Sequence, residues 1–316
     1  PTLTANSKGW VNFAPPLGNQ AIPQYLVGAN IIIPFKNRIL FFGIYQQASA
    51  DATATYYPNR MIYSSTGSAY YASPTPANQT VQSNSYYQNV AGQGGFLTAP
   101  ISQTINTVVT NEDVLLVGFN SKQLKLIFTF DDSLPFLYQT VNSELGSIYT
   151  YSGISLDEGS ITIGNYGLIL TTQNSCQRID LKIIDQVFTI SNKSNADLQV
   201  TGIRDFRNEL IYFTYVPITS PIANYAQPYP SQTLVYNYRE NNWAIFTENY
   251  TKYGTYRPDK NFTWATLPYT TWEDWTDAWN FGIISESFSI IKSTSAFDFV
   301  LQYFGAKPSL SNSVKT

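Results

Sequence analysis

The sequence predicts an all-β protein, and three observations support this prediction. Phe, Tyr and Trp make up 16% of the 316 residues, a share that suits the half-buried surface of a pleated sheet. Short apolar runs recur between turns made of Asn, Gly, Asp and Ser. No segment of helix length keeps a 3.6-residue apolar period, and residues 268–280 come closest to one.

The spacing of the predicted strands favours a β-propeller over a sandwich or a barrel. Clusters of three or four strands each occupy about 40–50 residues, the length of one propeller blade. The candidate blades are residues 25–67, 97–130, 145–190, 197–250 and 262–305. We therefore predict a β-propeller-like array of antiparallel four-stranded blades, five to seven in number and not necessarily complete. A plain twisted antiparallel meander is the alternative that this spacing leaves open.

Composition also predicts how the chain is organised. Residues 1–24 are rich in Pro, Gly and Asn, which indicates an extended leading segment. Residues 25–305 form the expected β-propeller-type domain, with a long polar insertion at about 68–95 that we expect to be a surface loop or an interface arm. Residues 306–316 form a C-terminal tail. Because the chain starts at Pro1 without Met or a signal peptide, we expect it to be a processed product or a piece of something longer.

Charge and missing residue types argue against several functions. The net charge is −3 and no basic run could neutralise a row of phosphates, so tight nucleic-acid binding is not expected. The absence of His removes the commonest general base and metal ligand, and the single Cys176 allows neither an intrachain disulfide nor a Cys-rich zinc site. No apolar run is long enough for a membrane-spanning helix. We predict that the chain is not an enzyme and has no catalytic, cofactor-binding or metal-binding residues.

One segment combines acidic residues with tryptophans, a combination that glycoside hydrolases use around a sugar ring. Its members are Glu273, Asp274, Asp277, Trp272, Trp275 and Trp279. Catalytic carboxylates more often come from different strands, whereas these acids are bunched in one short segment. We therefore expect the tryptophans to anchor a loop and the acids to face solvent.

Other charged residues are expected at the ends of strands. Asp131–Asp132 and Asp157–Glu158 stand beside Gly or Ser and are interpreted as hairpin turn residues. Five arginines at strand ends are expected to bridge blades or subunits: Arg38, Arg60, Arg178, Arg204 and Arg207.

Three ordered stretches resemble the blades of a known family. NRILFFG (37–43) followed by YPNRMIYSSTGS (57–68) is similar to the opening blade of phage tail and packaged-DNA stabilisation proteins. DVLLVGFNSKQLKLIFT (113–129) and the glycine-punctuated stretch 134–173 resemble the next blades. ELIYFTYV with TLVYNYRENNWAIFTE (233–248) resembles a later blade, so the resemblance covers most of residues 25–305.

The resemblance implies a structural virion protein of a phage tail or head-to-tail junction. Such a tail nozzle or stabilisation ring helps to retain and conduct packaged DNA. The expected partners are further copies of the chain in a homo-oligomeric ring, a portal-side adaptor and other tail proteins. DNA would pass through the channel without sequence-specific binding, and no membrane span is expected. The expected location is the virion, at the tail or portal vertex, after assembly in the host cytoplasm.

Two alternatives remain open. The first is a tail adhesin or carbohydrate-binding propeller that contacts the host surface through Tyr and Trp side chains, carried by residues 68–95 or 217–231. The second is an enzyme that degrades host surface polysaccharide through Glu273 or Asp274.

Overall fold

The fold is described from a computed structural model of the chain. It describes residues 13–21, 23–48, 52–67, 84–90, 92–183, 186, 189–190, 200–206, 208–217, 230, 232–247, 252–256, 287–295 and 298–304. The chain divides into two compact units, Pro1–Val187 and Phe188–Thr316, and each unit is considered by itself.

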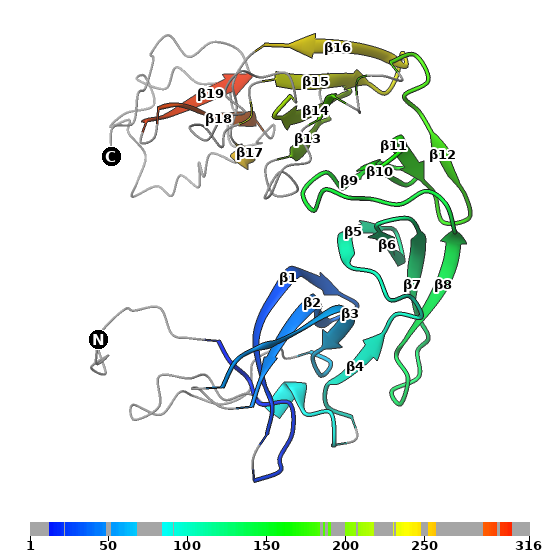
Figure 1. Cartoon of the computed structure of the whole chain (residues 1–316), viewed down its shortest axis with the longest axis vertical. Helices are drawn as coiled ribbons and strands as arrows, with labels where there is room; N and C mark the ends of the chain where they lie inside the picture. Colours follow the sequence, from blue (N-terminus) through cyan, green and yellow to red (C-terminus); the bar gives the residue numbers. More distant parts are fainter. Residues whose placement is uncertain are drawn as a thin grey trace, which may run out of the picture. The chain divides into compact units, whose positions relative to one another are not determined.

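The first unit contains three antiparallel four-stranded sheets, each a meander in which consecutive strands pair (Figure 1). The first sheet consists of β1 (Tyr25–Phe35), β2 (Arg38–Gln47), β3 (Thr55–Tyr63) and β4 (Gly95–Thr98). The second consists of β5 (Ile105–Asn111), β6 (Val114–Phe119), β7 (Gln123–Phe128) and β8 (Phe136–Asn142). The third consists of β9 (Ile154–Ser155), β10 (Ser160–Gly164), β11 (Gly167–Thr171) and β12 (Cys176–Arg178).

The second unit contains two further antiparallel sheets. The four-stranded sheet consists of β13 (Thr201–Asp205), β14 (Leu210–Tyr215), β15 (Gln232–Asn237) and β16 (Asn242–Phe246). The three-stranded sheet consists of β17 (Lys252–Tyr256), β18 (Ser287–Ser295) and β19 (Asp298–Phe304).

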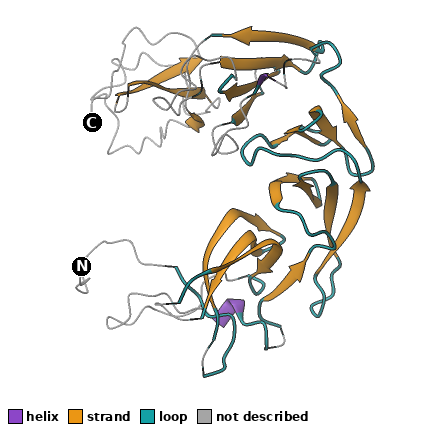
Figure 2. Ribbon diagram, in the orientation of Figure 1, coloured by secondary structure: helices purple, strands orange, loops and turns teal. Residues whose placement is uncertain are grey.

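The prediction of an all-β fold is confirmed for the described residues, in which four sheets are antiparallel four-stranded meanders and a fifth has three strands. Among the described residues, helical structure is limited to the 3₁₀ turn η1 (Asn84–Tyr86), drawn purple in Figure 2, and to the single 3₁₀ residue Thr189. The first strands of consecutive sheets also lie next to one another within each unit: β1 contacts β5 and β5 contacts β9 in the first unit, and β13 contacts β17 in the second.

Several strand boundaries differ from the sequence-based expectation. The candidate blade at 25–67 ends too early, because the fourth strand of the first sheet, β4, follows the polar insertion. Residues 147–152, at the start of the candidate blade 145–190, belong to no strand of the third sheet and end in a turn. Its Ser152 Oγ donates a hydrogen bond to the Tyr149 carbonyl (2.8 Å) and accepts one from the Ile163 amide (3.1 Å). Short side chains of this kind offer the backbone an alternative to a sheet ladder.

The main core of the first unit lies between its first two sheets. Leu40, Phe42 and Met61 of the first sheet are fully buried with Val117 and Leu126 of the second. Each such side chain stabilises the fold by about 1.5–3 kcal/mol relative to leaving it in water. This core fixes the relative position of the two sheets.

The second sheet is covered on its other face by the third. All six residues of β6 are buried, because this middle strand has neighbours on both faces of its sheet. Between the sheets, Ser155 Oγ donates to the Thr110 carbonyl (2.9 Å) and Asn111 Nδ2 donates to the Leu156 carbonyl (3.4 Å). The apolar run VLLVGF in β6 is therefore explained by burial from both sides.

The outer face of the first sheet is covered by other segments of the chain. The strand register places Ile32, Phe41, Ile62 and Phe96 in one row across β1 to β4. The central pair, Phe41 and Ile62, is buried in a second core with Leu17, which precedes β1, and Tyr86 of η1. This part of the polar insertion is thus a core element, whereas residues 68–83 lie outside the described residues.

Tyr86 is the anchor of this second core. Its ring meets Phe41 edge-on at 5.6 Å and Phe13 at 5.8 Å, and the side chain is fully buried. The hydroxyl has no hydrogen-bond partner in the described structure, and burial raises the pKa of Tyr86. The ring therefore stabilises the covering segment, while the hydroxyl does not.

We predict opposite outcomes for two substitutions of Tyr86. Tyr86→Ala should lower the free energy of unfolding by about 3–5 kcal/mol, because a large buried ring is lost. Tyr86→Phe should leave it unchanged or raise it by up to about 1 kcal/mol, because only an unpaired hydroxyl is lost. Urea denaturation checks this, with Tyr166→Ala, an exposed position, as the control. If Tyr86→Phe is as damaging as Tyr86→Ala, the hydroxyl has a partner and our account of this core is wrong.

Candidate functional site

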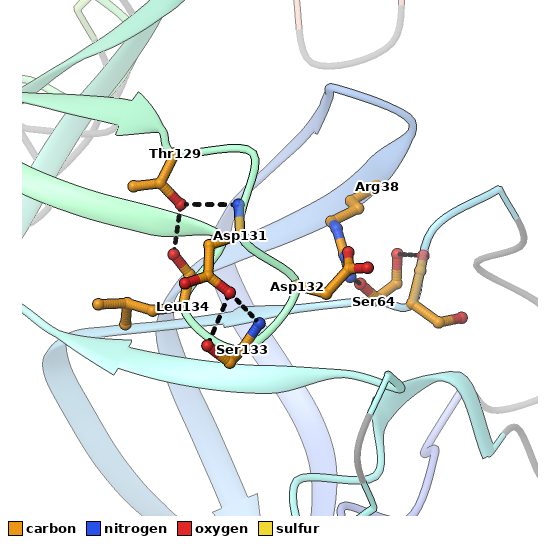
Figure 3. Close-up of polar contacts among 8 residues, drawn as sticks. Arg38, Ser64, Thr129, Asp131, Asp132, Ser133 and Leu134 are labelled. Carbon is orange, nitrogen blue, oxygen red and sulfur yellow. Dashed lines mark hydrogen bonds and ion pairs between the residues drawn. The ribbon is translucent and has the colours of Figure 1, made fainter.

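Several turns of the first unit meet at one end of its first two sheets. The β1–β2 turn places Lys36 against Asp113 of the β5–β6 turn, and the two side chains form an ion pair. Beside them, Arg38 at the start of β2 meets Asp132 in the β7–β8 loop, residues 129–135 (Figure 3). Oppositely charged side chains from different sheets therefore face each other twice at this end.

Arg38 is the buried member of this group. Its side chain is 3% exposed, whereas that of Asp132 is 91% exposed. The Nη1 atom donates to the Ser64 carbonyl at 2.7 Å, and Nη2 lies 3.6 Å from an Asp132 carboxylate oxygen. The guanidinium also lies over the Tyr63 ring, 5.6 Å from its centroid. The hydrogen bond to Ser64 is the close contact, and the ion pair is long and open to solvent.

The position of Arg38 follows from local chain geometry. Lys36 and Asn37 both adopt left-handed φ angles (49° and 58°), which makes the tight β1–β2 turn that starts β2 at Arg38. The Ile39 amide donates to Ser64 Oγ (2.9 Å), so the segment after β3 is held beside the start of β2. The Ser64 carbonyl is thereby brought to the guanidinium.

Burial has a clear electrostatic effect on Arg38. Desolvation lowers the pKa of the guanidinium, and the nearby Tyr63 and Asp132 act in the opposite direction. Its Nε atom has no hydrogen-bond partner in the described structure. An unpaired buried donor costs free energy, so the contacts through Nη1 and Nη2 must offset that cost.

The β7–β8 loop that carries Asp132 is held by its own hydrogen bonds (Figure 3). The Thr129 amide donates to the Pro135 carbonyl (3.0 Å), and Thr129 Oγ1 donates to the Leu134 carbonyl. Ser133 donates to the Asp131 carboxylate from its backbone N (2.8 Å) and from Oγ (2.7 Å). The loop is thus a closed, internally bonded structure, and Asp131 is a turn residue as predicted.

A second polar and aromatic group lies on the first sheet. Gly43 has a φ of +59° at a bulge, and the Asn30 side chain occupies the space that a side chain there would need. Asn30 Nδ2 donates to the Tyr56 hydroxyl (2.7 Å), and Tyr56 stacks on Tyr45 with ring centroids 4.5 Å apart. Both tyrosines remain more than one third exposed.

The other arginines highlighted by the sequence have different environments. Arg178 pairs with Asp180 two residues away (3.1 Å), and Arg204 lies over the rings of Phe206 and Tyr238. Arg60 lies in the middle of β3. Of the five arginines, Arg38 is the one seen to join two sheets, and Arg207 lies outside the described residues.

The remaining candidates are placed as follows. Asp157 and Glu158 form the turn between β9 and β10, as predicted. Cys176 begins β12, donates to Thr171 Oγ1 (3.6 Å) and is half-buried, and burial raises the pKa of its thiol. The acidic and tryptophan-rich segment 272–279 lies outside the described residues.

The described residues contain neither a cluster of metal-binding side chains nor a helix that could span a membrane. Within them, no group of three or more Asp, Glu and Cys side chains is close enough together to hold a metal ion. No helix of the described part of the chain is long and apolar enough to cross a membrane. The polar geometry at the Arg38 end instead connects sheets to each other.

Sequence reasoning did not find the pairing of Arg38 with Asp132 or the exposed Phe130 beside it. Phe130 is 83% exposed and adopts a left-handed φ of 61°, which is rare for an aromatic residue. The available signal was the run Phe-Asp-Asp-Ser-Leu-Pro at residues 130–135, in which the apolar residues Phe130 and Leu134 flank three turn residues. Such a run indicates a turn that exposes apolar side chains, but it does not name the partner of Asp132.

Comparisons with known proteins give similarity among solved structures. No model of a known protein family matches the sequence. No curated protein matches it either. Among solved structures, the chain is similar to PorZ, an essential bacterial surface component of the type-IX secretion system of Porphyromonas gingivalis, with 10% identity and a TM-score of 0.27. The match covers 95% of this chain and 48% of PorZ, so the chain spans about half of PorZ. A TM-score this low carries no argument about function.

We predict that the Arg38 contacts are unequal in strength. Arg38→Ala should lower the free energy of unfolding by about 2–4 kcal/mol, because the Ser64 carbonyl loses its donor and a void opens. Asp132→Ala should cost less than about 1 kcal/mol, because its ion pair is exposed and long. Thermal and urea unfolding of the two variants measure this. Equal losses would show that the contribution of Arg38 comes from the ion pair with Asp132 and not from the hydrogen bond to Ser64.

We also predict a loop transition at acid pH. The Ser133 hydrogen bonds hold the pKa of the Asp131 carboxyl below its ordinary value. Because the folded-state pKa is depressed, the contribution of these bonds is complete above the unfolded-state pKa and is lost as pH falls through the folded-state pKa. The Ser133 amide resonance should therefore titrate at a lower pH than a free aspartate, and Asp131→Asn should remove the transition. A Ser133 titration at or above the ordinary aspartate pKa would refute the assignment.

Proposed function

We propose that the chain is a structural subunit of a virion, located in a phage tail or at the head-to-tail junction. In this proposal its sheets are blades of a β-propeller, five to seven in all, and copies of the chain form a ring. The ring helps to retain packaged DNA and to conduct it during release. A portal-side adaptor and other tail proteins are its partners, and assembly takes place in the host cytoplasm.

One observation carries the proposal: consecutive antiparallel meanders whose first strands contact each other within each unit. In a propeller, the first strand of each blade lies nearest the axis, so consecutive first strands are neighbours. Radial repetition also leaves few free strand edges, which favours a stiff module that needs no disulfides. The resemblance of residues 37–43, 57–68, 113–129, 134–173 and 233–248 to phage tail and packaged-DNA stabilisation proteins supplies the virion context.

The Arg38 end supports a structural role in this proposal. A catalytic arginine must reach a substrate, whereas Arg38 is buried and hydrogen-bonded to the chain itself. The weakly acidic net charge of −3 fits a wall that DNA passes without being retained by it. We therefore propose that the chain acts by assembly and not by catalysis.

The second candidate function is glycan binding by a tail adhesin. The stacked, partly exposed rings of Tyr45 and Tyr56 favour it, because sugars bind to exposed aromatic rings beside amide groups such as that of Asn30. The loops first considered for this role, 68–95 and 217–231, lie mostly outside the described residues.

The test of the proposed function is the location of the protein in particles. Antibodies against the recombinant chain, with gold labels, should mark the tail or portal vertex of phage particles that carry its gene. A portal or adaptor gene beside the chain's own gene should accompany this result. Label on no part of the particle would refute the proposal.

Retention of the chain on a glycan array, abolished by Tyr56→Ala, would favour the adhesin instead. Loss of host polysaccharide that depends on Glu273 or Asp274 would favour an enzyme.

A further inference from the structure

Among the described residues, no carboxylate pairs with the positive charge of Arg60, whose guanidinium is held in a fixed orientation. Its guanidinium lies between two rings, 4.1 Å from the Tyr57 centroid and 4.8 Å from that of Phe96. Nε donates to Thr98 Oγ1 (3.3 Å), and neither Nη atom has a partner among the described residues. Arg38 and Arg178, by contrast, each pair with an aspartate. A planar guanidinium held in this way suits a carboxylate from outside the chain.

The surroundings of Arg60 have the character of an interface. β4 is an edge strand of the first sheet, and its Phe96 is 48% exposed beside Arg60. Arginine and aromatic side chains are the residues that most often dominate binding energy in interfaces. We call Tyr57, Arg60 and Phe96 the arginine patch.

The β7–β8 loop has the complementary chemistry. Phe130 (83% exposed) and Leu134 (51% exposed) project from it, and Asp131 and Asp132 are exposed between them. Phe130 keeps an unfavourable left-handed φ, and the hydrogen bonds of the loop hold it there. An apolar ring beside two carboxylates is therefore displayed in a fixed conformation, which reduces the entropic cost of binding.

We propose that the β7–β8 loop of one copy binds the arginine patch of a second copy of this chain. The Asp131 carboxylate, which is not part of the Arg38 ion pair, would pair with the Arg60 guanidinium, and Phe130 would pack against Phe96. No hydrogen bond or ion pair joins the two patches within the described residues of one chain. Complementary charge and exposed rings on both sides are what argue for a second copy as the occupant.

The arrangement determines the type of assembly. Two different patches of the same chain form a heterologous interface, which closes into a ring when the rotation between copies allows it. The inference rests on the proposed ring and adds to it the residues that would join neighbouring subunits.

Sedimentation velocity of the full chain over a range of concentrations tests this interface. Arg60→Glu and Phe130→Gly should each weaken self-association about tenfold or more. Leu181→Ala, at a 65% exposed apolar position, and Arg239→Ala, at a 76% exposed arginine, should leave it unchanged. Phe130→Gly should also raise the urea midpoint of unfolding, because Gly adopts a left-handed φ without strain. If Phe130→Gly is folded, more stable and less associated than the unsubstituted chain, its weaker association cannot be caused by a loss of structure.

A mixing experiment tests the pairing of the two patches. Arg60→Glu keeps an intact loop, and Phe130→Gly keeps an intact arginine patch. An equimolar mixture of the two variants should therefore form heterodimers and nothing larger, because only one intact pair of patches is left. Failure of the mixture to form heterodimers would overturn the pairing.

Two other outcomes distinguish this inference from the proposed function. If the unsubstituted chain associates and neither variant weakens it, the interface is wrong while the proposed ring stands. If the unsubstituted chain stays monomeric at every concentration, the interface is overturned. The labelling of phage particles, which does not depend on self-association in solution, then decides the proposed function separately.

Discussion

The structure of the first unit depends on one constraint: each sheet has two apolar faces, and both must be covered. The second sheet meets this requirement with a neighbouring sheet on each side, so β6 is buried along its whole length. The first sheet has a neighbouring sheet on one face, and on the other it is covered by the segment that precedes β1 and by η1. The same constraint thus explains a continuous apolar strand and a short helical turn within a polar insertion.

The polar contacts are arranged around these apolar faces. Arg38 brings a charge to the boundary between the first and second sheets, where its desolvation is offset by a backbone carbonyl and an exposed carboxylate. A contact of this kind adds little net stability compared with apolar packing. It adds geometric specificity, because the planar guanidinium donates hydrogen bonds in only a few fixed directions. Apolar burial therefore holds the sheets together, and the arginine specifies how their turns meet.

Much of the strand pattern could be predicted from the sequence, and the exceptions have physical causes. β10, β11, β14 and β15 fall inside the candidate blades 145–190 and 197–250, because their apolar residues lie between clear turn signals. β8 lies between the candidate blades 97–130 and 145–190 and was not predicted. It is a half-exposed edge strand, and its polar residues resemble those of a loop. The roles of Tyr86 and Arg38 were not predicted, because each depends on segments far away in the chain. Tyr86 lies in a polar stretch, and nothing in the neighbouring sequence indicates that its ring packs on the outer face of the first sheet.

The burial of Met61 has a consequence for the chemistry of the protein. The chain contains one methionine and one cysteine, so Met61 and Cys176 carry its only sulfur atoms. Met61 is fully buried between two sheets, and the raised pKa of Cys176 keeps its thiol in the less reactive protonated form. Oxidants attack exposed thioethers and thiolates first. In the folded protein, burial therefore slows oxidation of Met61, and the low fraction of thiolate slows oxidation of the half-buried Cys176.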